Sequence, residues 1–176
     1  TMETCVTTTW MKLCHKLLDI TGDPKYADQI EISFYNALMA SMKYDASEIA
    51  KYSPLEGMRH AGEEQCSMHI NCCNANGPRG FAMMPDFGVK AVEKNIFINY
   101  YGASIATVPL EKNKTIKIHQ KTTYPESGHI LMQIMPSTET EFSLNLRVPL
   151  WSSLTKVEVN GKTLEGVHPG SYLTIT

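Results

Sequence analysis

The spacing of apolar residues changes near residues 90–95, and this change separates two kinds of structure in one chain. Before it, apolar residues follow the i, i+3, i+4, i+7 spacing of amphipathic helices. The first such set is Trp10, Leu13, Cys14, Leu17 and Leu18. After it, apolar and polar residues alternate, as they do in half-buried strands. The pattern predicts an α+β chain by segment, with a helical part over residues 1–92 and a sheet domain over residues 93–176.

The helical part contains clear signals for where helices begin and end. Gly22 can end the first helix in a left-handed cap, and Asp23 with Pro24 can serve as N-cap and first residue of the second. The apolar face of the second helix is Tyr26, Ile30, Phe34, Ala37 and Leu38. The short connection predicts an antiparallel helix pair. We expect a third, shorter helix after Pro78, which Pro85 bends or ends.

The second part contains short alternating runs at about residues 96–99, 116–119, 130–134 and 142–148. In the last run we expect Ser143, Asn145 and Arg147 to point outward, because Leu144, Leu146 and Val148 alternate with them. Asn160-Gly161 lies between two strand-like tripeptides, residues 157–159 and 162–164, which is typical of a type I′ hairpin turn. These features predict an antiparallel β-sandwich.

Composition excludes several classes of function. The 176 residues have a net charge of -2 and no run of lysine or arginine, so no electrostatic footprint for nucleic acid is present. No stretch approaches the ~18 uninterrupted apolar residues of a membrane span. The chain starts at Thr1 almost inside a motif and ends at Thr176 in a strand-like run, so we expect a piece of a longer protein.

Five cysteines, at positions 5, 14, 66, 72 and 73, form an odd set that does not suit a disulfide framework. Cys14 lies on an apolar helix face and is predicted to be a small buried hydrophobe. A bridge between the adjacent Cys72 and Cys73 would be strained. A metal ion satisfies such a pair more easily.

Two ligand sets for a metal are possible. Glu3, Cys5, Cys72 and Cys73 supply one carboxylate and three thiols, which is a complete tetrahedral set for zinc. Glu3 and Cys5 face the same side if their segment is extended, whereas Cys72 and Cys73 need an irregular loop to converge. The rival set is local and consists of Cys66, His69, Cys72 and Cys73.

Three segments resemble successive signatures of the bacterial beta-L-arabinofuranosidase family of glycoside hydrolases. They are Glu3-Thr4-Cys5, the Glu-x-x-x-Tyr-Asn pattern of residues 31–36, and the Cys-Cys-x-x-Asn-x-x-Arg pattern of residues 72–79. The resemblance covers nearly the whole chain. It implies the last helices of an (α/α)6 barrel followed by a jelly-roll-like β-sandwich, cut at both ends, and a bacterial protein of the cytoplasm or periplasm.

The resemblance also implies roles for single residues. Zinc would be held by Glu3, Cys5, Cys72 and Cys73, with Cys72 as the nucleophile. Glu31 falls where the family has a carboxylate that contacts substrate; without the resemblance it reads equally well as a solvated charge. Such a protein would be a retaining hydrolase of furanosides, in which a thiolate replaces the usual carboxylate nucleophile.

The general acid of the family is a glutamate upstream of residue 1, so we expect the chain alone to be inactive. The alternative function is a zinc-stabilised structural or carbohydrate-binding module without turnover. Trp151 and Tyr172 are candidate sugar-contacting aromatics for that function, although such residues pack into a core more often.

Overall fold

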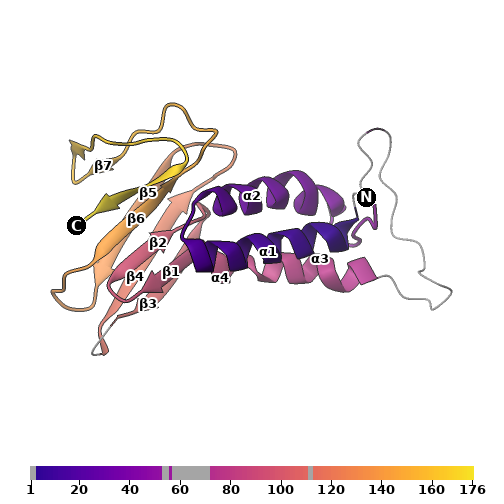
Figure 1. Ribbon diagram of the computed structural model, residues 1–176, viewed down its shortest axis with the longest axis horizontal. Coiled ribbons are helices and arrows are strands. Elements are labelled where there is room, and N and C mark those ends of the chain that lie inside the picture. The colour runs from indigo at the N-terminus through magenta and orange to yellow at the C-terminus, as the bar shows by residue number, and fades with distance from the viewer. Residues whose placement is uncertain (1–2, 53–55, 57–71, 111–112) are drawn as a thin grey trace. The chain divides into compact units, whose positions relative to one another are not determined.

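The computed structural model describes residues 3–52, 56, 72–110 and 113–176. The chain divides into two compact units, Thr1–Met84 and Pro85–Thr176 (Figure 1). The first unit contains the helices α1 (Thr4–Thr21), α2 (Lys25–Ser33) and α3 (Cys72–Ala82). The short helix α4 (Met84–Gly88) leads into the second unit, which contains all the strands that the structure describes.

Helix α1 begins at Thr4, earlier than its apolar pattern indicates. Its buried residues are Thr4, Thr8, Met11, Cys14 and Leu18. Cys14 is buried as predicted, but Trp10 and Leu13 are 43% and 49% exposed, so the predicted stripe is wrong there. Two threonines can occupy the buried face because their hydroxyls are satisfied: Thr4 Oγ1 donates to Ala50 O at 2.6 Å, and Thr8 Oγ1 donates to Asn76 O at 3.0 Å.

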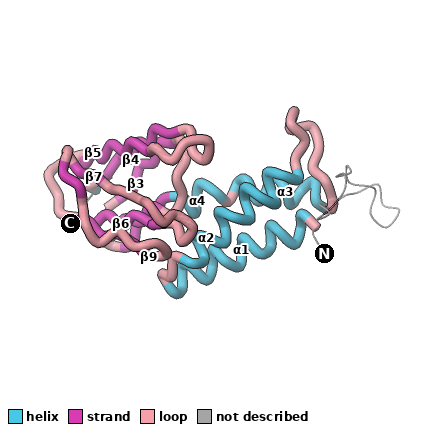
Figure 2. Tube along the Cα trace, turned by 90° about the horizontal axis from the view of Figure 1, so that it is seen from above, coloured by secondary structure: helices cyan, strands magenta, loops and turns pink. Residues whose placement is uncertain are grey.

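The turn between α1 and α2 has the expected chemistry. Gly22 has a φ of +66° and donates its N–H to Leu18 O at 2.8 Å, which confirms the left-handed cap. Asp23 Oδ1 accepts the N–H of Lys25 at 3.0 Å, and Pro24 already has helical backbone angles. Helix α2 continues through a π-helical turn, η1 (Phe34–Leu38), and a 3₁₀ turn, η2 (Met39–Ser41). Helix α1 packs against both α2 and α3 (Figure 2).

Helix α3 begins at Cys72, six residues before the predicted start at Pro78, which lies inside it. Close packing explains why a glycine-containing segment is helical here. A Cβ atom on Gly77 would lie 2.2 Å from Ile49 Cδ1, and one on Gly80 would lie 2.6 Å from Leu38 Cδ2. A larger side chain at either position would therefore require Ile49 or Leu38 to move.

The strands of the second unit form two main sheets. One has the order β1 (Val89–Val92), β2 (Asn95–Ile98), β6 (Ser143–Val148), β9 (Ser171–Ile175); the other has β3 (Ser104–Pro109), β4 (Thr115–Thr122), β5 (Ile130–Pro136). The second sheet is antiparallel, but β2 pairs with β6 in parallel, with Asn95 opposite Ser143. The expectation of a purely antiparallel arrangement is therefore wrong at this pair.

A separate hairpin joins β7 (Glu158–Val159) to β8 (Lys162–Thr163). Its two turn residues, Asn160 and Gly161, have φ angles of +51° and +79°. Positive φ at both central positions defines a type I′ turn, so the predicted hairpin is confirmed.

The two main sheets share one hydrophobic core. Its buried members come from four strands and the loop after β2: Ile96, Ile98, Tyr101, Val108, Ile116, Ile118 and Leu144. The predicted outward orientation of Asn145 and Arg147 is wrong, because both side chains are buried. Strand β6 lies between β2 and β9, and both of its faces carry buried residues. Arg147 Nε donates to Asn99 O at 2.7 Å, which offsets part of the cost of burying the guanidinium.

Candidate metal centre

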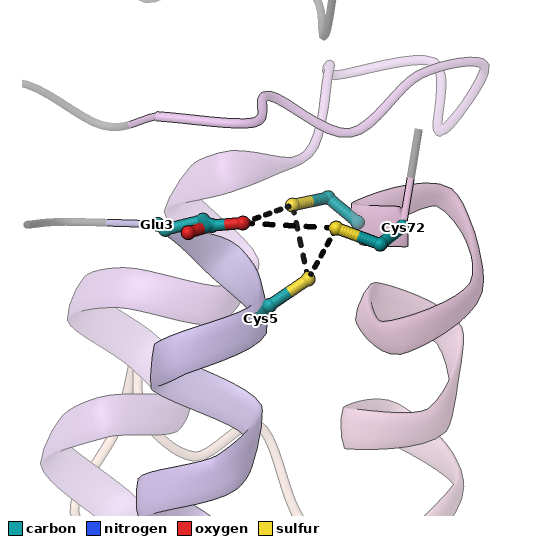
Figure 3. A group of neighbouring side chains, drawn as sticks. Glu3, Cys5 and Cys72 are labelled. Atoms are coloured by element: carbon teal, nitrogen blue, oxygen red, sulfur yellow. Dashed lines mark hydrogen bonds between the residues drawn. The ribbon is translucent and has the colours of Figure 1, made fainter. Parts of the chain in front are cut away.

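The four proposed ligands come from the starts of two helices. Glu3 is the N-cap of α1 and has extended backbone angles, with φ −78° and ψ 135°, whereas Cys5 lies in the first helical turn. Cys72 and Cys73 are the first two residues of α3. The expected extended segment is therefore found only at Glu3, and the expected irregular loop at the cysteine pair is a helix start instead. In Figure 3, Glu3, Cys5 and Cys72 point toward one another.

The four donor atoms lie close together. Cys5 Sγ is 3.1 Å from Cys72 Sγ and 3.3 Å from Cys73 Sγ. Glu3 Oε1 is 3.6 Å from Cys72 Sγ and 3.9 Å from Cys73 Sγ. All four ligand atoms lie within 4.8 Å of one another. Residues 67 positions apart in the sequence are thereby brought into one cluster.

The donor set fits a tetrahedral zinc ion. Zn–S bonds of about 2.3 Å and a Zn–O bond of about 2.1 Å put sulfurs about 3.8 Å apart and the oxygen about 3.6 Å from each sulfur. The oxygen–sulfur distances already match this geometry. The sulfur–sulfur distances are shorter, so metal binding would require them to open by roughly half an ångström. Thiolate-rich sites of this kind select zinc over magnesium or calcium.

The main chain around residues 49–52 holds the start of α1 beside the cluster. Thr4 donates its N–H to Lys51 O at 3.0 Å, and Glu3 forms an isolated β-bridge with Tyr52. Cys73 Sγ lies 3.8 Å from Lys51 O and is fully buried, whereas Cys72 keeps part of its surface exposed. The two adjacent cysteines therefore differ in access to solvent.

The surroundings favour the protonated form of each thiol when no cation is bound. Burial raises the pKa of Cys5 and of Cys73. The hydrogen bond to Cys5 is the main cause that raises the pKa of Cys72, and burial adds to it. Three neighbouring thiols next to a carboxylate cannot all ionise without a positive charge among them. A metal ion supplies that charge, and its binding releases the protons.

Asn76, which the sequence marks only as the asparagine of the Cys-Cys-x-x-Asn-x-x-Arg pattern, is a neighbour of the cluster. Asn76 Nδ2 donates to Cys5 Sγ at 3.2 Å. The available signal was its position three residues after Cys73 and four after Cys72, since residues at this spacing share one face of a helix. This spacing has meaning only in a helix, whereas the sequence predicts an irregular loop at the cysteine pair.

Glu31 is not a member of this donor group. Glu31 is on α2 and only 2% exposed, so its interpretation as a solvated charge is wrong. Asp28, one turn earlier, is buried as well. Cys66 and His69 of the rival zinc set lie outside the described residues.

The two aromatic candidates for sugar contact differ in their surroundings. Trp151 is 59% exposed. Tyr172 donates from its hydroxyl to Asn99 Oδ1 at 2.5 Å and packs edge-on against Phe97. The described helices include none that is both long and apolar enough to cross a membrane.

The fold and the site define a chain with a helical unit that can bind a metal ion and a separate sheet unit. Its sequence matches two family models: "Beta-L-arabinofuranosidase, GH127 catalytic domain" over residues 1–86, and "Beta-L-arabinofuranosidase, GH127 middle domain" over residues 95–176. The chain belongs to the GH127 beta-L-arabinofuranosidase family of glycoside hydrolases.

Known relatives agree with this membership. The chain is 26% identical over 185 aligned positions to the non-reducing end beta-L-arabinofuranosidase of Bifidobacterium longum subsp. longum, which covers 93% of this chain and 27% of that protein. It superposes on a GH127 beta-L-arabinofuranosidase from Geobacillus stearothermophilus T6 with a TM-score of 0.83 and 26% identity, covering 98% of this chain and 29% of the other. A second structure, described as a glycoside hydrolase, shares the fold with a TM-score of 0.86 at 24% identity. That match covers 98% of this chain and 30% of the other. The chain thus spans less than a third of the length of these relatives.

Proposed function

We propose that this chain carries the metal centre and the nucleophile of a retaining glycoside hydrolase that acts on furanosides such as beta-L-arabinofuranosides. One observation carries the proposal. Three thiols and a carboxylate converge within 4.8 Å in the segment that matches the family's catalytic domain. The names of the relatives supply the substrate class.

The ligands of the proposed zinc ion are Glu3, Cys5, Cys72 and Cys73. A bound zinc ion would keep its cysteine ligands in the thiolate form at neutral pH, where a free cysteine is mostly protonated. The protein's own contribution is to hold α1 and α3 so that their first turns meet. The main-chain bond from Thr4 to Lys51 fixes one side of that meeting point.

Cys72 is the proposed nucleophile, and its partial exposure supports this choice over Cys73, which is fully buried. A nucleophile must reach the anomeric carbon of the sugar. As the C–S bond forms, the glycosidic C–O bond breaks, and the leaving oxygen takes a proton from a general acid. Water then attacks the same carbon from the side opposite to the sulfur and gives its proton to the former general acid, which now acts as base. The C–S bond breaks, Cys72 leaves as the thiolate, and the configuration is retained.

Glu31 is the proposed substrate-contacting carboxylate. Its burial on α2 supports a role inside the protein, because a buried carboxylate needs partners to offset the loss of solvation. We further propose that the helices belong to an (α/α)6 barrel and the two sheets to a β-sandwich, with the domain boundary near residue 92. The two family models, over residues 1–86 and 95–176, support this division.

Metal analysis and thiol labelling test the proposal. We expect about one zinc per chain purified without added metal, and loss of that zinc in Cys5→Ala but not in His69→Ala. Retention of zinc in Cys5→Ala, with loss in His69→Ala, would favour the local site instead.

A furanose mimic that carries an electrophile at its anomeric position should alkylate Cys72, which peptide mass spectrometry can locate. Cys72→Ser is the matched control and should take up no label. Labelling on Cys73 or Glu31 would contradict the assignment. Bound zinc with no labelling at all would favour the second candidate, a zinc-stabilised carbohydrate-binding module, for which the exposed Trp151 is the supporting observation.

A further inference from the structure

Asn76, which is not itself a proposed ligand, donates a side-chain hydrogen bond to the cluster. Its Nδ2 donates to Cys5 Sγ at 3.2 Å, which is within the range for a bond to sulfur. Cys5 Sγ lies 3.1 Å from Cys72 Sγ and 3.3 Å from Cys73 Sγ, and it is the thiol that α1 contributes to this cluster. Asn76 therefore bonds to the sulfur of α1 that contacts both cysteines of α3.

Asn76 is attached to α1 through its main chain as well as its side chain. Its carbonyl oxygen accepts the hydroxyl proton of Thr8 at 3.0 Å. Thr8 lies three residues after Cys5, so the two contacts fall on one face of α1. The next residue of α3 is Gly77, where a Cβ atom would overlap Ile49. The hydrogen bond from Thr8 and the close packing at Gly77 therefore fix where the side-chain amide of Asn76 lies.

We propose that Asn76 is a positioning residue of the metal centre, which orients Cys5 and stabilises the negative charge on its sulfur when a metal is bound. This inference rests on the proposed zinc site. Three thiolates and one carboxylate around Zn²⁺ leave a net charge of −2 on the centre. A neutral amide that presents N–H to sulfur offsets part of this charge without adding a competing ligand.

The orientation of the amide follows from the same charge. A thiolate accepts hydrogen bonds and repels the amide oxygen, so the N–H side of Asn76 must face Cys5. An aspartate has the same shape but presents a negative oxygen to the sulfur. It should therefore disturb the centre more than an alanine, which only removes the bond.

Cobalt substitution in the 176-residue chain tests the role directly. Co²⁺ occupies tetrahedral thiolate sites and absorbs through charge transfer from sulfur, so the band reports the electronic state of the sulfurs. Removal of an N–H···S bond raises the energy of the sulfur electrons and moves this band to longer wavelength. In Asn76→Ala we expect that shift, together with Zn²⁺ binding weakened about 10–100-fold in competition with a chromophoric chelator.

Asn74→Ala is the matched control, because Asn74 is an exposed asparagine in the first turn of the same helix. It should keep both the band position and the affinity within about twofold. Asn76→Asp should bind Zn²⁺ more weakly than Asn76→Ala. Circular dichroism checks that each variant retains its helices; alanine favours a helix, so Asn76→Ala is expected to fold.

The outcomes separate this inference from the proposed function. Wild-type chain that binds no Co²⁺ or Zn²⁺ would contradict the metal centre itself. Wild-type binding with an unchanged band and affinity in Asn76→Ala would overturn the role of Asn76 alone. Equal weakening in Asn76→Ala and Asn74→Ala would show a general effect of α3 and would also overturn it.

Discussion

Replacement of Gly77 by alanine tests how closely α3 packs against Ile49 and which atom of Ile49 limits the distance. The new methyl group would lie 2.2 Å from Ile49 Cδ1, 3.2 Å from Cγ2 and 3.4 Å from Cγ1 of the same side chain. The first distance is far inside van der Waals contact, whereas the other two require only small movements. Ile49 is buried and precedes Ala50 and Lys51, whose carbonyls hold Thr4.

The expected energies come from two opposing effects. Overpacking of a filled core costs about 1–3 kcal/mol, and alanine gains about 1 kcal/mol over glycine inside a helix. We therefore expect Gly77→Ala to lower the free energy of unfolding by about 0–2 kcal/mol, too wide a range to be decisive alone. Ile49→Val alone should cost about 0.5–1.5 kcal/mol through the cavity it leaves.

The double variant resolves this ambiguity, because valine lacks Cδ1, the atom in the closest contact. The alanine methyl then fills the space that the lost Cδ1 vacates, so the double variant should be more stable than the sum of the single changes predicts. We expect a coupling of about 1–2 kcal/mol in favour of the pair. The four forms of this cycle serve as their own controls.

Urea unfolding followed by tryptophan fluorescence measures the cycle. The chain has two tryptophans, Trp10 in the helical unit and Trp151 in the sheet unit. In a Trp151→Phe background the signal comes from the helical unit alone. Additivity of the two changes within about 0.5 kcal/mol would refute the contact as the limiting one.

Four further predictions concern the site and the sheets. Zinc affinity should rise with pH between about 6 and 8, because thiols with a raised pKa must release protons on binding; competition titrations at several pH values check this. In the metal-free chain the pKa values of these thiols are higher in the folded state than in the unfolded state. They therefore contribute stability at neutral pH that is lost as the pH rises through them, so urea titrations at alkaline pH should give a lower free energy of unfolding. Arg147→Ala should destabilise the sheet unit by more than about 3 kcal/mol, measured by Trp151 fluorescence, since it leaves a cavity and removes the donor to Asn99 O; a loss below 1 kcal/mol would contradict this. The chain alone should not hydrolyse aryl furanosides faster than buffer, because it spans less than a third of its relatives and a general acid typically contributes about 10²–10⁴-fold; turnover that Cys72→Ser abolishes would show that the chain contains its own acid.

Features fixed by local chemistry were predicted well from the sequence. The left-handed cap at Gly22 and the type I′ turn at Asn160-Gly161 depend on positive φ angles that few residues adopt. Glu3, Cys5, Cys72 and Cys73 were also singled out as candidate ligands, because carboxylates and thiols have a metal-binding chemistry that other residues lack; their role as ligands stays a prediction. The structure brings all four side chains together.

Features fixed by tertiary packing were predicted poorly. The segment Cys72–Ala82 has the composition of a turn, with two glycines and a proline, yet it is a helix whose glycines pack closely against Ile49 and Leu38. Thr8 is buried and Trp10 is half-exposed, since a hydroxyl with a partner can replace an apolar group on an inner face. Arg147 is buried because its strand, β6, lies between β2 and β9, and its Nε donates to Asn99 O. The apolar periodicity of one segment does not show which residues of another segment will pack against it.

The direction of the two helices gives the metal centre a role in the fold. Cys5 lies beside Cys72, and Thr8 lies beside Asn76, so α1 and α3 run parallel. Parallel helices place two positive N-terminal ends together, which repel each other. The four candidate ligands lie at these ends, and with Zn²⁺ bound as proposed they would carry a net charge of −2, which both helix ends favour. The negative charges that are unfavourable side by side without a metal therefore stabilise the parallel helix arrangement once a metal is bound. The chemistry of the site and the packing of the two helices depend on each other.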